Sequence, residues 1–377
     1  MKPFSDKLLS WYAQHGRRGL PWQNERDPYK VWLSEIMLQQ TQVSTVKERY
    51  LQFVNTFPHL EDLAKAQIDE VMSLWAGLGY YTRARNLHAC AKVIQQEYQG
   101  KFPQDIISLS QLPGIGRSTA AAIAAFCFQQ KNSILDANVK RLIGRIYAVE
   151  EDFKKAATNE YLWQIAHDLL PKDARNMPAY TQALMDYGAT VCTPRNPKCS
   201  GCVFKKECLA FQQDKVEKIP NKVKKVSSKE VRSVMLCVLS GDQVLLNLRP
   251  PSGIWGGLWS FPESSWSDHL EIQDLQVQTL EEFQDLPLTI LRNALPKGTL
   301  LASRKHVFTH RILYFQIVIL RVKHIFEIDS TRYKWVNLSG MLELGLPTPV
   351  KQFMQDYVAA NSSLLQSDVT HDVVSVR

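Results

Sequence analysis

Four cysteines lie within one short stretch of the sequence, spaced C-x6-C-x2-C-x5-C: Cys192, Cys199, Cys202 and Cys208. Soft thiolate ligands in a tight group select zinc or an iron–sulfur cluster. Only Cys199 and Cys202 have the spacing of a zinc knuckle. The uneven pattern therefore favours a cubane cluster held by one loop, and zinc stays open as the alternative. Cys90, Cys127 and Cys237 lie in apolar stretches and are expected to be packed thiols.

A disulfide framework is the other use that four cysteines could have, and it requires an oxidising compartment. Residues 1–20 contain no apolar core of signal-peptide length and no small-residue cleavage site. No apolar run long enough to span a membrane occurs in the sequence. We therefore expect a cytoplasmic protein with reduced cysteines and no membrane partner.

A second candidate site is the segment Leu112–Ala120, LPGIGRSTA, with a Gly-x-Gly turn between two expected helices. Glycine permits a positive φ and a close approach of a ligand. The first amides of the following helix face outward and bind anions. These residues predict a helix–hairpin–helix that grips a DNA phosphate through Gly114, Gly116 and the helix start at Ser118.

Two carboxylates could act as acids. Asp136 directly follows Ile134-Leu135, where it either caps the next helix or takes part in chemistry, and the two roles are compatible. A helix N-terminus stabilises the ionised form, which could oppose a developing positive charge. At 100° per residue, Glu35 shares its helix stripe with apolar side chains and amides instead of Lys and Arg. Such surroundings raise a carboxyl pKa, as a general acid near neutral pH requires, although an ordinary surface glutamate is the alternative.

The elements that must position these residues are helices. Residues 1–211 show helical patterns throughout, and Asp27-Pro28 is a helix start with an N-cap and proline at the first position. Amphipathic segments of helix length recur seven times, at 28–43, 44–56, 68–76, 82–98, 118–129, 138–147 and 158–170. The sequence predicts an all-α domain whose last part is the 192–208 cysteine loop.

The pattern changes after this helical region. Residues 212–230 are Lys-rich and predict a linker. Beyond it, 231–239 and 244–248 predict a β-hairpin, 313–320 a central strand, and 349–360 a last helix. A second, α+β domain at 231–362 and a loose polar tail at 363–377 complete the expected multidomain fold.

Positive charge is the strongest compositional signal, because 45 Lys and Arg against 37 Asp and Glu give the 377 residues a net charge of +8. That excess favours a polyanionic partner. Basic residues cluster in two places, 140–145 and the cysteine loop: Lys140, Arg141, Arg145, Arg195, Lys198, Lys205 and Lys206. Each cluster alone could be a solvated face. Their position beside the other motifs predicts phosphate contacts.

Taken in order, these motifs resemble the helix–hairpin–helix DNA glycosylase superfamily and, within it, the adenine DNA glycosylase family. The resemblance covers nearly the whole chain. It is carried by LSEIMLQQTQ, WAGLGYYTRARNL, LPGIGRSTA, ILDANVKR, the four-cysteine loop and a C-terminal domain similar to the MutT/Nudix fold. No Nudix catalytic box with its Arg-Glu and Glu-Glu pairs occurs in 231–362, so the second domain is expected to bind and not to hydrolyse.

The resemblance implies excision of adenine opposite 8-oxoguanine or guanine in base excision repair. Glu35 would protonate N7 of the adenine, and Asp136 would stabilise the oxocarbenium ion at C1′, directly or through a covalent intermediate. Asn138 would help to position the sugar. The cysteines Cys192, Cys199, Cys202 and Cys208 would hold a 4Fe–4S cluster. The partner would be double-stranded DNA containing the mispair, bound by a monomer.

Other residues are implied in recognising the flipped-out base and the lesion. Gln40, Leu78 and Tyr80 match positions that wedge into the duplex and contact the lesion. Phe308-Thr309-His310 resembles a loop that reads 8-oxoguanine, in which bacterial relatives often have Ser where this chain has Thr309. Ala137 also stands where relatives usually have Gly, next to Asp136.

Ser118 distinguishes the chain from endonuclease III-like enzymes. The resemblance implies that those enzymes have a lysine at this position. A serine hydroxyl cannot form the Schiff base that leads to strand cleavage. We therefore expect a monofunctional glycosylase that leaves an abasic site. The alternatives are a bifunctional glycosylase/lyase and a DNA-binding iron–sulfur protein without enzymatic activity.

Overall fold

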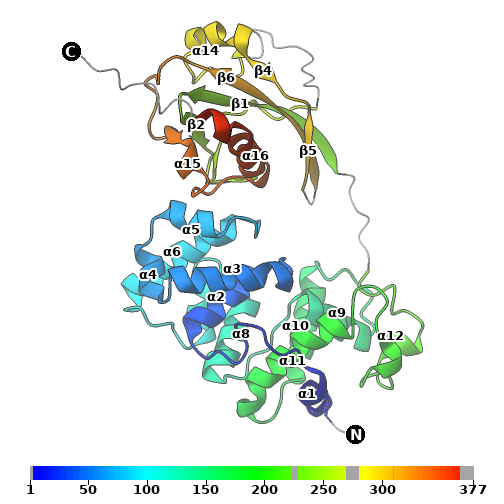
Figure 1. The fold of residues 1–377 in the computed structure, drawn as a ribbon. Helices are drawn as coiled ribbons and strands as arrows, with labels where there is room; N and C mark the ends of the chain where they lie inside the picture. The colour runs from blue at the N-terminus through cyan, green and yellow to red at the C-terminus, as the bar shows by residue number, and fades with distance from the viewer. Residues whose placement is uncertain (1–2, 222–227, 269–279, 309, 366–377) are drawn as a thin grey trace, which may run out of the picture. The chain divides into compact units, whose positions relative to one another are not determined.

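The computed structural model describes residues 3–221, 228–268, 280–308 and 310–365. The chain divides into two compact units, one of Met1–Lys65 with Asn86–Lys224 and one of Ala66–Arg85 with Lys225–Arg377. Figure 1 shows the helices of the first unit and the sheet of the second. The predicted combination of an all-α domain and an α+β domain is confirmed.

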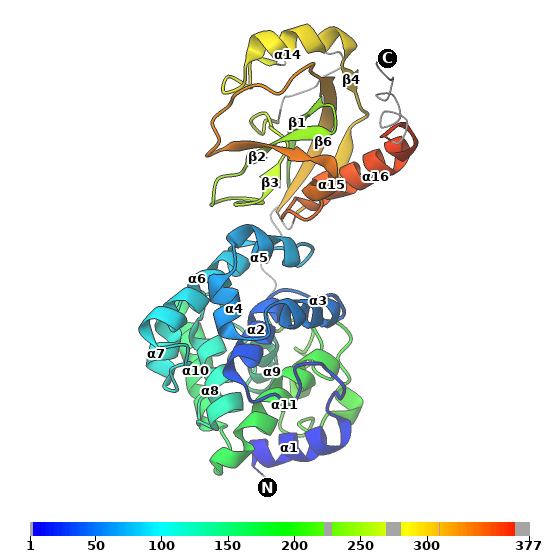
Figure 2. The same ribbon diagram turned by 60° about the vertical axis from the view of Figure 1, so that its left-hand side comes forward.

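The helices of the N-terminal region follow one another along the chain, α5 and the start of α6 belonging to the second unit. They are α1 (Phe4–His15), α2 (Pro28–Leu38), α3 (Val43–Thr56), α4 (Leu60–Lys65), α5 (Ile68–Leu74), α6 (Thr82–Glu97), α7 (Ile106–Gln111), α8 (Arg117–Phe128), α9 (Ala137–Ile146), α10 (Ala156–Asp168), α11 (Met177–Thr190) and α12 (Leu209–Gln212). Helix α11 packs against α1, α8 and α9, and α2 packs against α3 and α8. Figure 2 shows this bundle from the side.

Local sequence explains where α2 begins and ends. The Asp27 carboxylate accepts the Tyr29 N–H at 3.0 Å, and Pro28 occupies the first turn, so the predicted start is confirmed. The predicted extension of this helix to residue 43 was wrong. Gln40 has a left-handed φ of +55°, which an α-helix does not tolerate, and the next helix begins at Val43.

A mixed sheet forms the core of the second unit. Its strands are β1 (Lys229–Ser240), β2 (Gln243–Leu248), β3 (Trp259–Ser260), β4 (Thr299–Leu300), β5 (Arg304–Val307), β6 (Arg311–Arg321) and β7 (Tyr333–Asn337). The order is β3-β2-β1-β6-β4, with β5 also on β6 and β7 also on β2. The expected hairpin is β1–β2, and the expected central strand is β6, which runs parallel to β1. Helices α14 (Leu288–Ala294), α15 (Leu338–Met341) and α16 (Thr348–Leu365) complete the unit.

The predicted domain boundaries needed three changes. The 212–230 linker is shorter than expected, because Ile219 is buried against the helical unit and β1 already begins at Lys229. Residues 66–85 fall in the second unit instead of the first, and within it the Trp259 indole N–H donates to the Asp69 carboxylate at 3.1 Å. Helix α16 continues to Leu365, and residues 366–377 of the expected tail lie outside the described residues. In the described part of the chain, no helix is both long and apolar enough to cross a membrane.

Candidate active site

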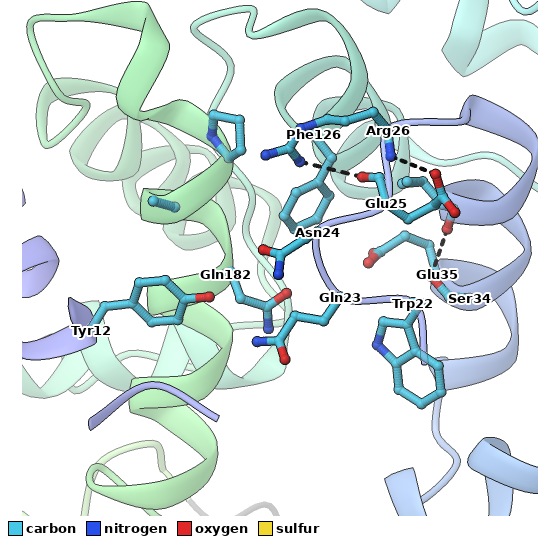
Figure 3. Close-up of a pocket in the computed structure, with 13 residues that line it drawn as sticks. Tyr12, Trp22, Gln23, Asn24, Glu25, Arg26, Ser34, Glu35, Phe126 and Gln182 are labelled. Atoms are coloured by element: carbon cyan, nitrogen blue, oxygen red, sulfur yellow. Dashed lines mark hydrogen bonds between the residues drawn. The ribbon is translucent and has the colours of Figure 1, made fainter. Parts of the chain in front are cut away.

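Glu35 faces a hollow of about 100 Å³ inside the helical unit. We call it the Glu35 hollow, and its wall includes Tyr12, Trp22, Asn24, Phe126 and Gln182. Figure 3 shows Glu35 on α2 and Gln182 on α11 on opposite sides of this space, with Gln23 and Asn24 between them. Aromatic walls with amide groups between them suit a flat, polar heterocycle.

The Glu35 carboxyl holds its proton more tightly than an ordinary glutamate does. Burial is the largest cause and the nearby charge of Asp136 the second, and together they raise the pKa of Glu35 to about 8. Glu35 is half-buried and lines this hollow. The rise expected from the helix stripe is present, and Glu35 therefore carries a proton at neutral pH.

Asp136 is the N-cap of α9, as one of its two expected roles requires. One carboxylate oxygen accepts the Val139 N–H at 2.8 Å, and the other accepts from the Asn138 amide at 3.3 Å. Burial raises the pKa of Asp136, while these two donors and Arg141 act in the opposite direction. The carboxylate is thus held in one place by donors, which a group that must stabilise a cation needs.

Asn138 is itself held by a second set of contacts. Its Oδ1 accepts from Arg141 Nη2 at 2.9 Å, and the same guanidinium donates to the carbonyls of Gly188 (2.7 Å) and Cys192 (2.7 Å). The contact has no room for a side chain at Gly188, because a Cβ there would lie 2.5 Å from Asn138 Cβ. Asn138, predicted at the site, therefore lies next to Asp136 in a closely packed setting.

The glycine turn has the expected geometry. Gly114 has a φ of +76°, and a Cβ on it would lie 2.8 Å from Asn86 Cβ. Gly116 is the N-cap of α8 and has open space where its Cβ would be. Ser118 is half-buried, and its hydroxyl accepts the Leu135 N–H at 3.1 Å. Ser118 thereby ties α8 to the segment that leads into Asp136.

The four predicted metal ligands line one hollow, together with Leu142 and Arg145 from α9. None of them forms a disulfide. Within the described residues, no three Cys, His, Asp or Glu side chains converge as holding a single metal ion requires. Four soft thiol donors around one hollow are the ligands that zinc or an iron–sulfur cluster takes.

Donors from the helices reach two of these sulfur atoms. Arg145 Nη1 lies 3.5 Å from Cys192 Sγ, and the Tyr187 hydroxyl lies 3.1 Å from Cys202 Sγ. Arg145 also donates to the carbonyls of Thr193 (2.7 Å) and Ile219 (2.8 Å). These bonds anchor the cysteine loop to α9 and α11.

The prediction that Arg141 and Arg145 contact phosphate was wrong. Both are buried, at 6% and 2% exposure, and their guanidinium groups are engaged by carbonyls inside the unit. Lys140, between them, is partly exposed. The basic residues of the cysteine loop are all exposed, as a phosphate-binding surface requires: Arg195, Lys198, Lys205 and Lys206.

The residues expected to contact a lesion belong to both units. Gln40 is exposed at the end of α2. In the second unit, Tyr80 is 50% exposed with a positive φ of +47°, whereas Leu78 is buried at 4%. To insert into a duplex as predicted, the Leu78 side chain would first have to leave the buried position that it has in this structure.

The expected lesion-reading loop lies in the second unit, between β5 and β6. Phe308 packs edge-on against Trp255 (5.0 Å between ring centroids) and His306 (4.6 Å), and its N–H donates to the Arg311 carbonyl at 2.8 Å. His310 is exposed, and Thr309 lies outside the described residues. Phe308 and His310 therefore lie at one turn, and the rings of Trp255 and His306 pack against Phe308.

Gln182, Asp186 and Arg17 were not among the predicted site residues. Gln182 lines the Glu35 hollow, and its amide donates to Asp186, which Arg17 also binds. Arg17 and Asp186 are 169 residues apart. No local pattern marks such a contact, and the only available signal was the unusual position of Asp186 on the buried stripe of an amphipathic segment.

Comparisons with known proteins match both parts of the chain. Residues 33–167 match the model of the HhH-GPD superfamily base excision DNA repair proteins, and residues 234–356 match that of the NUDIX domain. The chain is 34% identical over 360 residues to the adenine DNA glycosylase of Buchnera aphidicola subsp. Acyrthosiphon pisum, covering 94% of this chain and 97% of the relative. It is 36% identical to the Homo sapiens adenine DNA glycosylase over 83% of this chain and 66% of the relative.

Solved structures are also similar to the helical region, among them a thermostable thymine-DNA glycosylase. It is 30% identical, with a TM-score of 0.50 over 56% of this chain and 95% of its own. The Glu35 hollow, the capped Asp136 and the relatives that span nearly the whole sequence lead to one conclusion: this chain belongs to the adenine DNA glycosylase family, enzymes of base excision repair that act on N-glycosidic bonds.

Proposed function

We propose that this enzyme hydrolyses the N-glycosidic bond of adenine paired with 8-oxoguanine or guanine and leaves an abasic site. Glu35 protonates the adenine at N7, which makes the base a better leaving group. Asp136 stabilises the oxocarbenium ion at C1′, and water completes the hydrolysis. Two carboxylates thus take two roles, as in glycosidases.

The pKa of Glu35, raised to about 8 by burial, is the observation that carries this proposal. A carboxyl that keeps its proton at neutral pH can donate it to a purine nitrogen, whereas an ordinary glutamate cannot. The hollow that Glu35 faces offers amide groups and aromatic walls for a base removed from its stack. Asn138 and Arg141 support the second carboxylate by fixing Asp136 at the start of α9.

Hydrolysis without strand cleavage fits the residue at the start of α8. Ser118 has no amine, so it cannot form an imine with the abasic sugar. Its hydroxyl is occupied in holding the Leu135 N–H, so it has a structural role in this protein.

We further propose that the cysteine loop holds a 4Fe–4S cluster with an architectural role. The donor set supports this, because Cys192, Cys199, Cys202 and Cys208 line one hollow beside Arg145. Bound there, the cluster would keep the exposed basic residues of the loop facing the phosphates of double-stranded DNA. Iron and acid-labile sulfide near four per chain would support the cluster, and one zinc per chain would exclude it.

Recognition of the opposite base is proposed for the second unit. Phe308 and His310 lie at one turn, where a ring and an imidazole could contact 8-oxoguanine. Gln40 and Tyr80 are exposed and can enter a duplex. We expect the second unit to bind without hydrolysing nucleotides, and the enzyme to act as a monomer.

The test is single-turnover cleavage of a labelled duplex with one A·8-oxoguanine pair, for wild type and Glu35→Gln. The products are split with and without alkali. Breaks that need alkali and fall about 10²–10⁴-fold in rate with Glu35→Gln support the proposal. Breaks without alkali favour a lyase, and binding without adenine release favours a non-enzymatic DNA-binding protein.

A further inference from the structure

The Gln182 amide has one fixed orientation, which a buried carboxylate imposes. Asp186 lies one helical turn after Gln182 on α11 and is 0% exposed. Its Oδ1 accepts from Gln182 Nε2 at 2.9 Å. A carboxylate that pairs with a guanidinium, as Asp186 does with Arg17, accepts hydrogen bonds, so the NH₂ end of the amide must face Asp186. The carbonyl Oε1 is left for the Glu35 hollow, on the side shown in Figure 3.

Arg17 holds the Asp186 carboxylate in one place. Its backbone N–H donates to Oδ2 at 2.8 Å, and its guanidinium reaches Oδ1 through Nε at 2.8 Å and Nη2 at 2.7 Å. Charge-assisted bonds of this kind are among the strongest that side chains make. If the amide of Gln182 turned over, Oε1 would face this carboxylate, with two acceptors in contact inside the protein. The turned orientation is therefore disfavoured.

The orientation decides which purine the hollow accepts. The N7 edge of adenine presents an acceptor at N7 and an NH₂ donor at position 6, whereas a 6-oxopurine presents two acceptors. Protonated Glu35 supplies a donor for N7, and Gln182 Oε1 supplies an acceptor for the 6-amino group. A 6-oxo group would face Oε1 with no hydrogen between them. A site built to bind a donor rejects an analogue that lacks it.

We propose that Asp186 is a positioning residue which, by orienting Gln182, makes the enzyme select a 6-aminopurine over a 6-oxopurine. The proposal rests on the proposed function of Glu35 as the acid at N7. Asp186 does not touch the base, so its effect must pass through Gln182. A merely structural Asp186 would hold the Arg17 segment and would leave selectivity unchanged.

The experiment compares single-turnover rates on two duplexes, with adenine or hypoxanthine opposite 8-oxoguanine. Hypoxanthine carries oxygen in place of the 6-amino group. Four forms are measured: wild type, Asp186→Ala, Gln182→Leu and the double variant. Intrinsic differences between the two leaving groups cancel when the adenine-to-hypoxanthine ratio is compared across these forms.

We expect each single variant to lower the ratio by about tenfold or more, and the double variant to lower it no further than Gln182→Leu. A folded Asp186→Ala enzyme with the wild-type ratio overturns the proposal, as does a double variant whose loss is the product of the two single losses. Asp186→Ser serves if the alanine form does not fold, since a hydroxyl that donates and accepts also frees the amide.

Leu63→Ala is the control for lost stability, because Leu63 is fully buried in α4 of the same unit and is not among the residues that line the Glu35 hollow. Its ratio should equal that of wild type. Wild-type enzyme that released no adenine would remove the proposed function and this inference with it. Normal adenine release with unchanged selectivity in Asp186→Ala would overturn the inference alone.

Discussion

Arg141 Nη2 donates to Asn138 Oδ1 at 2.9 Å, and this bond decides which end of the Asn138 amide faces Asp136. Because Oδ1 is taken, the NH₂ end turns to the Asp136 carboxylate at 3.3 Å. The same guanidinium binds the Cys192 carbonyl at 2.7 Å. The cysteine loop and the candidate catalytic carboxylate are therefore joined by three consecutive hydrogen bonds.

Arg141→Lys should slow the chemical step by about 10–10²-fold with a small change in DNA affinity. A single ammonium cannot reproduce the fork that reaches Asn138, Gly188 and Cys192 together. Single-turnover rates and equilibrium binding to the same duplex separate the two effects. Arg175→Lys, the same change at an 83%-exposed side chain, is the control and should match wild type. A normal rate for Arg141→Lys would show that Asp136 is positioned without this arginine.

Glu35→Gln should stabilise the protein at high pH while removing activity. The folded pKa of Glu35 is about 8 against 4.5 for the free side chain, so the folded state holds more protons between these values. Wild-type stability therefore falls as pH rises through this window, by up to about 1.4 kcal/mol per pH unit. Glutamine does not ionise, so the variant does not lose this stability as the pH rises.

The measurement is the melting temperature of wild type and Glu35→Gln from pH 5 to pH 9. The two curves should separate steadily up to about pH 8 and then run parallel. Glu160→Gln, at a 69%-exposed side chain, should follow wild type throughout. Curves that never separate would mean that Glu35 ionises freely in the folded protein and does not hold the proton that a general acid needs.

Alanine substitutions at the two glycines of the hairpin should have different effects, one on stability and the other on DNA binding. Gly114→Ala places a side chain at a φ of +76° and against Asn86, which should cost about 1–3 kcal/mol of folding free energy. Gly116→Ala meets open space in this structure, so it should fold with nearly normal stability. Its methyl group instead occupies the place where a phosphate would approach, so it should weaken DNA binding.

Thermal unfolding and salt-dependent binding titrations on both alanine variants check this prediction. Equal loss of stability in the two would contradict the assignment of strain to Gly114. Unchanged DNA affinity in Gly116→Ala would contradict a phosphate site at the start of α8.

Ser118→Ala should destabilise the helical unit by about 1–3 kcal/mol, because it leaves the buried Leu135 N–H without its acceptor. Ser118→Thr keeps the hydroxyl and should retain most of the stability. Chemical denaturation of the two variants gives the difference. Identical stability of the alanine and threonine forms would show that the hydroxyl does not hold the Asp136 segment.

Predictions from the sequence were most accurate where a local structure depends only on residues of the same short segment. Asp27-Pro28 and Asp136 begin helices through their own side chains, and the Gly114 turn needs only its local geometry. The burial of Glu35 followed from its helix stripe. The β-rich segments 231–239 and 244–248, on either side of Ser-Gly-Asp, likewise predicted a hairpin that the structure confirms.

Residues whose role depends on distant partners were predicted poorly. Arg141 and Arg145 have the charge of phosphate ligands, but carbonyls of the cysteine loop some fifty positions later surround them. Gln182 reaches the hollow that Glu35 also lines only when α11 packs against α1, which carries Tyr12, and against α8. Periodicity reports which face of a helix is buried, and it does not report which polar group lies opposite.

The burial of Ile219 sets a practical limit for anyone preparing the catalytic half alone. The residue is 1% exposed, and its carbonyl accepts from Arg145 Nε at 2.8 Å. A recombinant fragment cut at 211, where the helical pattern stops, would open an apolar slot and leave a guanidinium short of an acceptor beside the cysteine loop. A fragment that ends after Asn221 keeps both, so it should be the form of the helical unit suited to crystallisation and ligand screening.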